Sequence, residues 1–206
     1  MNLLFDIETT GLPLRKSGKY NYRHPEDFVS ARIVSIAWKL AHPGQVDDTI
    51  LPKVHLIRPN GYSISPEVAK IHGITQEKAL ADGVELADAL QDFFADVGQA
   101  QRLISHNVDF DKAVLKSELF RIVLTNPVAE IYLAQLKRLE KVCTMRLATD
   151  HFRLAKWPKL AELYTFLTKN PVEAERLHDA VYDVILCEVS YNILWRDVCR
   201  KAAACS

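Results

Sequence analysis

Three short segments carry acids whose spacing could do chemistry, and the first is FDIETTGL at positions 5–12. Asp6 and Glu8 stand two apart there, in an apolar run that opens at Leu3. In an extended strand, side chains at i and i+2 share a face about 6 to 7 Å apart, so the two acids would lie side by side. Half-buried acids repel unless one stays protonated, bases surround them or a divalent cation bridges them. For an isolated D-x-E pair, an edge strand whose acids face water is the commoner outcome.

The second segment, SHNVDFDKAVLKSEL at positions 105–119, lies where a predicted strand gives way to a helix. At helical spacing, Asp111 falls on an apolar stripe, whereas Asp109 falls on the side of Lys112 and Lys116. Asp111 is therefore expected to point inward and Asp109 outward. An inward carboxylate needs a partner, because an unpaired buried charge is strongly unfavourable. The stripe that Asp111 joins consists of Val108, Leu115, Leu119 and Ile122.

The third segment, LHDAVYDVILCEV at positions 177–189, opens the last long predicted helix. Asp179 is suited to cap this helix, which leaves His178 just outside it and Asp183 one turn inside it. A single histidine at a helix entrance is more often structural than catalytic, but this one stands beside an acid that should face inward. The buried face predicted for Asp183 also carries Leu186, Cys187 and Leu194.

One explanation accounts for all the inward-facing acids, Asp6, Glu8, Asp111 and Asp183: they converge on divalent metal. Oxygen ligands suit a hard cation such as Mg²⁺ or Mn²⁺, whereas zinc would call for more histidine or cysteine. His178 would then be placed to accept a proton from the attacking water. The sequence has no P-loop, dinucleotide-binding, zinc-protease or serine-hydrolase motif that would indicate another enzyme class.

The elements that must position these acids are strands followed by alternating strands and helices. Ser65-Pro66-Glu67 predicts the start of a short helix that ends at Gly73, and Pro43-Gly44 predicts a hairpin turn. The pattern indicates an α/β fold, a five-stranded mixed sheet flanked by helices. Strands are predicted at 2–8, 33–40, 50–57, 103–105 and 142–144. Further helices are predicted at 84–97, 109–124, 129–139, 145–152, 159–168 and 180–201.

Length and composition limit the class of protein. The 206 residues hold 26 basic and 26 acidic side chains, and no linker-like stretch divides them, so a single domain over 1–206 is expected. Zero net charge argues against a protein that coats nucleic acid, but it permits a local basic rim. The sequence shows no signal-like N-terminus and no membrane-length apolar run, and its four cysteines form no C-x-x-C pair. A cytoplasmic protein with reduced cysteines and no membrane partner is predicted.

The polar stretch between Pro13 and Ser30 is long for a loop. It mixes cations with aromatic rings, as a contact with single-stranded nucleic acid would. A solvated surface excursion without a partner is an equally good interpretation. Its basic and aromatic members are Arg15, Lys16, Lys19, Tyr20, Tyr22, Arg23 and His24.

Together, the three acidic segments resemble the DEDDh family of 3′-to-5′ exonucleases, which includes the proofreading epsilon subunit of bacterial DNA polymerase III and ribonuclease T. FDIETTGL is similar to the first family motif, SHNVDFD to the second and HDAVYD to the third. The resemblance implies a ribonuclease H-like fold and two Mg²⁺ or Mn²⁺ ions that hydrolyse the terminal phosphodiester, releasing nucleoside 5′-monophosphates. It implies that Asp6, Glu8 and Asp183 bind the metal that activates the nucleophile. Asp6 and Asp111 would bind the second metal, and His178 would be the general base.

The resemblance also implies a set of substrate contacts. PEVAKIHGIT, at 66–75, is similar to the family segment whose acid and histidine meet the terminal nucleotide, which matches Glu67 and His72. Thr9 and Leu12 would hold the terminal sugar and wedge against its base. An ordinary helix C-terminus is an alternative interpretation of His72 and the glycine after it. The full set assigned to substrate binding is Thr9, Leu12, Glu67, His72, His106, Asn107 and Phe110.

The sequence departs from the epsilon-type domain at two places, and the resemblance leaves alternative functions open. The stretch between Leu12 and Arg32 is longer than in the epsilon-type domain, and only 23 residues follow Asp183, so no polymerase-binding tail is expected. The leading prediction is an exonuclease that acts on single-stranded DNA with a free 3′ end. An exoribonuclease that trims RNA 3′ ends and a catalytically silent nucleic-acid-binding module are the alternatives, and the sequence leaves the oligomeric state open.

Overall fold

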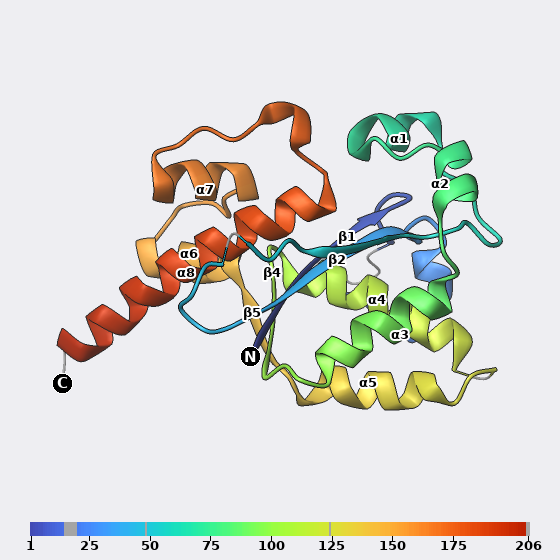
Figure 1. Ribbon diagram of the computed structural model, residues 1–206, viewed down its shortest axis with the longest axis horizontal. Helices are drawn as coiled ribbons and strands as arrows, with labels where there is room; N and C mark the ends of the chain where they lie inside the picture. Colours follow the sequence, from blue (N-terminus) through green and yellow to red (C-terminus); the bar gives the residue numbers. More distant parts are fainter. Residues whose placement is uncertain (15–19, 48, 124, 205–206) are drawn as a thin grey trace.

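Five strands form one mixed sheet at the centre of the molecule (Figure 1). The computed structural model describes residues 1–14, 20–47, 49–123 and 125–204. β1 pairs antiparallel with β2 and parallel with β4; β2 is antiparallel to β3, and β4 is parallel to β5. The sheet therefore confirms the predicted α/β fold class. In the order β3-β2-β1-β4-β5, its strands are β3 (Lys53–Leu56), β2 (Ile33–Ala41), β1 (Asn2–Thr9), β4 (Arg102–Ser105) and β5 (Glu140–Cys143).

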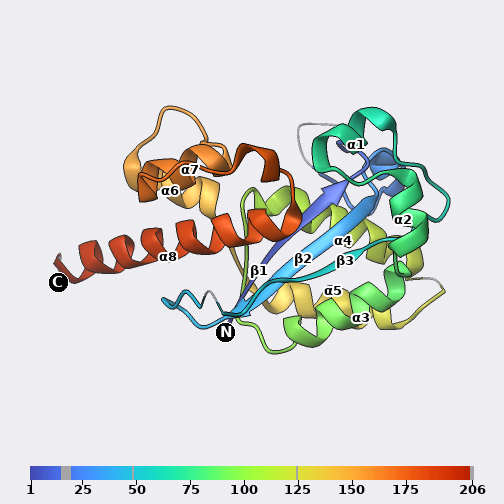
Figure 2. The same ribbon diagram turned by 45° about the horizontal axis from the view of Figure 1, so that its top comes forward.

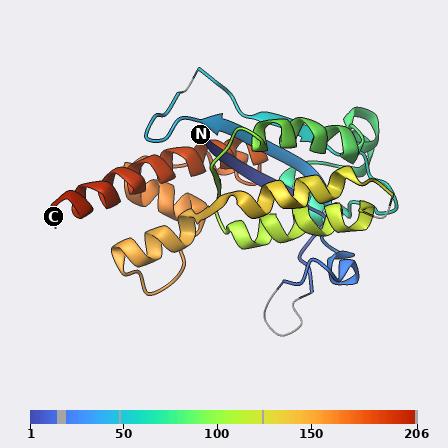
Figure 3. The same cartoon turned by 90° about the horizontal axis from the view of Figure 1, so that it is seen from below.

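Helices cover both faces of the sheet (Figure 2). On one face lies α8 (Ala180–Ala204), backed by α6 (Thr144–Phe152) and α7 (Leu160–Thr168). The opposite face carries α3 (Leu86–Val97), α4 (Val108–Ile122) and α5 (Val128–Arg138), as Figure 3 shows. The remaining helices are α1 (Pro66–His72), α2 (Gln76–Asp82) and the short 3₁₀ helices η2 (Pro25–Phe28) and η3 (Ala174–Arg176).

The period of two in β1 divides its side chains between the two faces. Leu3 and Phe5 pack into the large core formed with α3, α4 and α5. Leu4 packs on the other face, in a smaller core with Val184 of α8. Because side chains alternate along a strand, Asp6 and Glu8 continue the row of Leu4. The two acids therefore face the side of the sheet on which α8 lies.

Most predicted elements are present, but one predicted strand is too long and three short helices were not predicted. The short helix α1 is confirmed, since the Ser65 side chain accepts a hydrogen bond from Val68 N at 3.4 Å and Gly73 ends the helix at φ 73°. The strand predicted at 50–57 is too long, because only β3 (Lys53–Leu56) forms there. Residue 52 is a proline, which has no N–H to donate to a neighbouring strand, and residues 50 and 51 are exposed. Sequence reasoning missed α2, η2 and η3, which span seven residues or fewer and have little periodic pattern.

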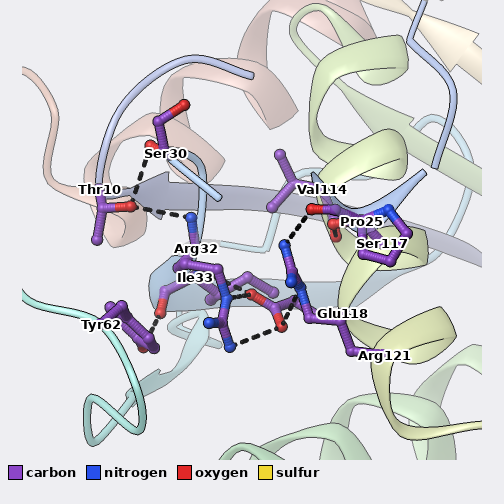
Figure 4. Close-up of polar contacts among 10 residues, drawn as sticks. All are labelled: Thr10, Pro25, Ser30, Arg32, Ile33, Tyr62, Val114, Ser117, Glu118 and Arg121. Atoms are coloured by element: carbon purple, nitrogen blue, oxygen red, sulfur yellow. Dashed lines mark hydrogen bonds and ion pairs between the residues drawn. The ribbon is translucent and has the colours of Figure 1, made fainter. Parts of the chain in front are cut away.

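A buried ion-pair cluster ties the start of β2 to α4 beside the turn that follows β1 (Figure 4). Arg32 donates to both carboxylate oxygens of Glu118, at 2.6 and 3.1 Å, and Arg121 lies 3.6 Å from the same carboxylate. The backbone N–H of Arg32 donates to the Thr10 hydroxyl, which in turn donates to the carbonyl of Ser30. Glu118, which is 1% exposed, therefore holds the segment that carries the Thr10 turn in place.

Replacing Glu118 by alanine is expected to lower the free energy of unfolding by about 3 to 5 kcal/mol, because two guanidinium groups would remain in a largely buried site without their carboxylate. Glu85→Ala removes the acid of an exposed pair with Arg58, at 3.5 Å, and is expected to cost about 1 kcal/mol or less. Urea unfolding of both variants checks the difference. Equal losses would show that the cluster does not hold this part of the fold.

The structure bears on the predictions about the cysteines and about membrane-spanning segments. Cys143, Cys187 and Cys199 are free thiols, while Cys205 lies outside the described residues. None of the helices within the described part of the chain is both long enough and apolar enough to span a bilayer. The single-domain assignment stays a prediction.

Candidate active site

The acids predicted to converge come from three elements that meet at one edge of the sheet. β1 and β4 are parallel, so their carboxyl ends lie together at this edge. Asp6 and Glu8 stand near the end of β1, and Asp111 lies in the first turn of α4, which follows β4. Asp183 lies in the first turn of α8.

Asp111 points inward, as its helical position predicted. It is 3% exposed, and its carboxylate accepts a hydrogen bond from the Ser105 hydroxyl. Asp109 points outward and forms an ion pair with Lys112 at 2.7 Å. Sequence reasoning did not single out Ser105, whose signal is a hydroxyl at the end of a buried strand, in the first position of the second motif.

The start of α8 fixes His178 and Asp183. Asp179 caps the helix, because its carboxylate accepts from the backbone N–H groups of Val181 and Tyr182 at 2.9 and 3.4 Å. Burial raises the pKa of the Asp183 carboxylate, and the backbone N–H of His178 is near enough to it to lower that pKa by a smaller amount. His178 has a left-handed backbone with φ 65°, a conformation that costs a non-glycine residue energy and often occurs at functional sites. The predicted cap and the position of His178 outside the helix are confirmed.

The three segments bring their functional side chains close together. One ligand atom each from Glu8, His178 and Asp183 lie within 4.8 Å of one another, which is a spacing that a metal ion could bridge. After burial, the negative charges of Asp111, Glu8 and Asp183 raise the pKa of Asp6, which places these acids near one another. The five residues of the three motifs therefore form one cluster in the folded chain.

Burial, together with the charges of neighbouring acids, raises the pKa values of these acids. Burial is the main cause for Glu8, followed by the charges of Asp183 and Asp111, and its pKa is raised to about 8. Burial likewise raises the pKa of Asp111 and of Asp183 to about 7, and that of Asp6 well above its usual range. Buried oxygen donors that keep their protons because their charged forms are desolvated and repel one another are suited to a hard divalent cation.

The stability of the metal-free protein is expected to fall as the pH rises from about 4 to about 8. Unfolded carboxyls titrate near pH 4, whereas these folded ones keep their protons until about pH 7 to 8, so the folded state binds more protons across this window. Mn²⁺ is expected to replace these protons. At about pH 8 and 100 times the dissociation constant, it should raise the melting temperature by about 5 to 10 °C.

Thermal unfolding in a chelator and in Mn²⁺, repeated across this pH range, measures both effects. The gain from Mn²⁺ should shrink as the pH falls toward 5, because protons then compete for the same oxygens. A melting temperature whose pH dependence is the same with and without Mn²⁺ would contradict the electrostatic description of the site.

A cleft of about 890 Å³ opens over the acid cluster. Its acidic floor includes Asp6, Glu8, Asp111 and Asp183, with His178 beside them. Of the predicted substrate-binding residues, Glu67 is not among those that line the cleft: it is exposed on the first turn of α1. The six that line it are Thr9, Leu12, His72, His106, Asn107 and Phe110.

Two histidines of the cleft differ in the ring nitrogens they can offer. Both ring nitrogens of His106 bond within the protein, to the Thr144 hydroxyl at 2.9 Å and the Pro158 carbonyl at 3.0 Å, and burial lowers its pKa to about 4. His72 accepts from the backbone N–H of Ile74 through Nδ1, at 3.1 Å, while its Nε2 has no hydrogen-bond partner among the described residues. His72 therefore has one ring nitrogen that is buried and unpaired among the described residues, whereas both ring nitrogens of His106 are paired.

The apolar part of the cleft was only partly predicted. Leu12 is 76% exposed on one side, and α1 contributes Val68 and Ile71 on the other. Val68, Ile71 and His72 follow helical spacing along one face of α1, and this pattern is the signal that could have placed α1 against the site. Tyr20 also lines the cleft, and its ring lies 6.2 Å from that of Phe110.

Solved structures of nucleases share this fold. Exonuclease X, solved with 5′-overhanging duplex DNA, has a TM-score of 0.60 and 24% identity, with 98% of this chain and 93% of that chain covered. Exonuclease I of E. coli, solved with a 5cy-dT13 oligonucleotide, has a TM-score of 0.68 and 20% identity. That match covers 97% of this chain but 41% of the other. Pop2p of S. pombe, in a form with Mg²⁺ and Mn²⁺ bound, has a TM-score of 0.67 and 17% identity over 93% and 81% of the two chains.

The family follows from the sequence match. The exonuclease family model of the RNase T type matches residues 3–191, which include all three acidic motifs. The chain therefore belongs to this exonuclease family, and the resemblance to DEDDh exonucleases with a ribonuclease H-like fold is confirmed. No curated protein matches the chain.

Proposed function

We propose that the protein is a 3′-to-5′ exonuclease that uses two Mg²⁺ or Mn²⁺ ions to release nucleoside 5′-monophosphates from single-stranded DNA. The observation that carries the proposal is the cluster itself: ligand atoms of Glu8, His178 and Asp183 within 4.8 Å, with Asp6 and Asp111 in electrostatic contact. Four acids in one cleft suit a pair of hard cations, and a cleft with an open apolar side suits the end of a nucleic-acid strand.

The proposed roles follow the motifs. Glu8 and Asp183 would hold the first cation, Asp6 would reach both, and Asp111 would support the second. When bound, two such ions stabilise the attacking and leaving oxygens of an in-line displacement at phosphorus. His178 accepts the proton of the attacking water, and it is exposed enough to pass that proton to solvent. A ligand atom of its ring lies within 4.8 Å of ligand atoms of Glu8 and Asp183, so the ring is beside the acids.

The terminal nucleotide would lie between the acidic floor and the apolar wall of the cleft. Leu12 and Phe110 are placed to contact the base, and His72 lines the same cleft. Single-stranded DNA is favoured because an exposed apolar rim accommodates an unpaired base. A cytoplasmic location belongs to the same proposal.

Oligonucleotides labelled at the 3′ or the 5′ end test this function. With Mg²⁺, the 3′ label is expected to appear at once as a mononucleotide, while the 5′-labelled strand shortens by successive nucleotides. No release, or first release of the 5′ label, contradicts the proposal. A DNA and an RNA strand of equal sequence separate DNA degradation from RNA trimming, and binding without turnover would indicate a silent binding module.

A further inference from the structure

A group of five basic side chains lies beside the cleft, and we call it the α4 basic surface. Lys112 and Lys116 stand one turn apart on α4, and Lys141 comes from β5 close enough for its charge to interact with both. Arg146 of α6 reaches α4 through its contact with Asp109. The fifth member, Arg23, belongs to the segment that packs on α4 through η2 (Figure 3).

The α4 basic surface has more positive charge than its surroundings neutralise. Within the described residues, its one acidic contact is Asp109, which pairs with Lys112 at 2.7 Å and with Arg146. The pKa of Lys116 is lowered by burial and by the charges of Lys112 and Arg23. Burial and the two α4 lysines lower the pKa of Lys141. Because the chain has zero net charge, this local excess of positive charge balances the negative charge of the acid cluster. A local excess of positive charge attracts an anionic ligand.

Aromatic rings accompany these cations. Lys116 Nζ lies 4.8 Å from the centre of the Tyr22 ring, and the Arg23 guanidinium lies 6.0 Å from it. Two residues earlier, Tyr20 contacts Phe110 at the cleft. Rings on which bases can stack, next to cations spaced along a surface, are the features of a single-stranded nucleic-acid site. Arg15, Lys16 and Lys19 of the same predicted contact lie outside the described residues.

We propose that the α4 basic surface binds the sugar–phosphate backbone of a single strand upstream of the bond that is cut, with Tyr22 as a stacking platform. This inference rests on the proposed function, because it takes the strand whose 3′ end lies in the cleft. Asn107, Phe110 and Lys112 lie at the start of α4, so the path from cleft to basic surface runs along one helix. The contacts are to phosphates, so the surface adds affinity without choosing a sequence.

The test is the salt dependence of binding. The probe is a 5′-fluorescein oligo-dT of about 15 nucleotides with phosphorothioate linkages at its 3′ end, measured by anisotropy. The double variant Lys116→Gln/Lys141→Gln is expected to bind about 10-fold more weakly, and the slope of log affinity against log salt should fall by about 1.4, or about 0.7 for each lost phosphate contact. The variant Lys116→Arg/Lys141→Arg keeps the charges and should retain the slope.

A matched control and a short probe complete the design. Lys201→Gln removes an exposed lysine near the far end of α8 (Figure 1) and should leave affinity and slope as in the parent protein. A probe of about 3 nucleotides, too short to reach beyond the cleft, should lose less affinity than the long one in the double glutamine variant. An unchanged slope, or equal losses for both probes, overturns the inference. Because the assay measures binding, failure of cleavage would count against the proposed function and leave this result standing.

Discussion

Asp183→Asn is expected to lower the rate of mononucleotide release by about 10³-fold or more, because it removes a charged oxygen ligand from a site that stabilises charge at the reacting phosphate. The same change should stabilise the metal-free protein at about pH 8, since the raised pKa of Asp183, about 7, shows that its charged form is disfavoured there. Steady-state hydrolysis in saturating Mg²⁺ and thermal unfolding in a chelator measure the two effects. Opposite signs for activity and stability distinguish a functional acid from a structural one.

Asp179→Asn is the matched control for this prediction. It removes a charge that also raises the pKa of Asp183, and asparagine caps a helix as well as aspartate does. Activity should stay within about 10-fold of the parent protein, since Asp179 is exposed and is not a proposed ligand. Asp183→Asn activity within the range of this control would contradict the role of Asp183.

His178→Gln is expected to slow hydrolysis by about 10²- to 10⁴-fold, the usual contribution of general-base catalysis. Affinity for Mn²⁺ should change little, because the four acids remain. The position of the ring makes this a sharp test: its nitrogen lies within 4.8 Å of ligand atoms of Glu8 and Asp183, so it could also serve as a ligand. Rates at several Mn²⁺ concentrations separate the two roles.

The Mn²⁺ dependence of the His178→Gln rate distinguishes a general base from a metal ligand. A loss of rate that persists at saturating Mn²⁺ supports the base, whereas a loss that saturating Mn²⁺ restores shows that His178 is a ligand. His151→Gln, which changes a histidine of α6 whose ring packs on Phe152, is the control and should keep the parent rate.

Periodicity predicted the parts of the site that depend on short-range geometry. The i, i+2 spacing of Asp6 and Glu8 placed both on one face of β1, and helical spacing separated inward Asp111 from outward Asp109. The Asp179 cap fixed the start of α8. These positions follow from the geometry of a single strand or helix, which the order of residues determines.

Features that depend on packing between elements were harder to predict from the sequence. Glu67 is exposed and does not line the cleft, whereas Val68 and Ile71 of the same helix do. The ring nitrogens of His106 bond to Thr144 and Pro158, partners 38 and 52 residues away. The left-handed backbone of His178 has no sequence signal either, since non-glycine residues adopt it only where tertiary contacts support it.

Calorimetric titration with Mn²⁺ at about pH 7 tests the central claim, that three distant segments build one site for divalent cations, most directly. The prediction is two ions for each chain, with proton release seen as a heat that changes with the ionisation enthalpy of the buffer, because acids with pKa values of about 7 to 8 give up protons to the metal. Asp6→Asn, which affects the acid proposed to reach both ions, should weaken both. No binding, or binding that neither releases protons nor responds to Asp6→Asn, would contradict it.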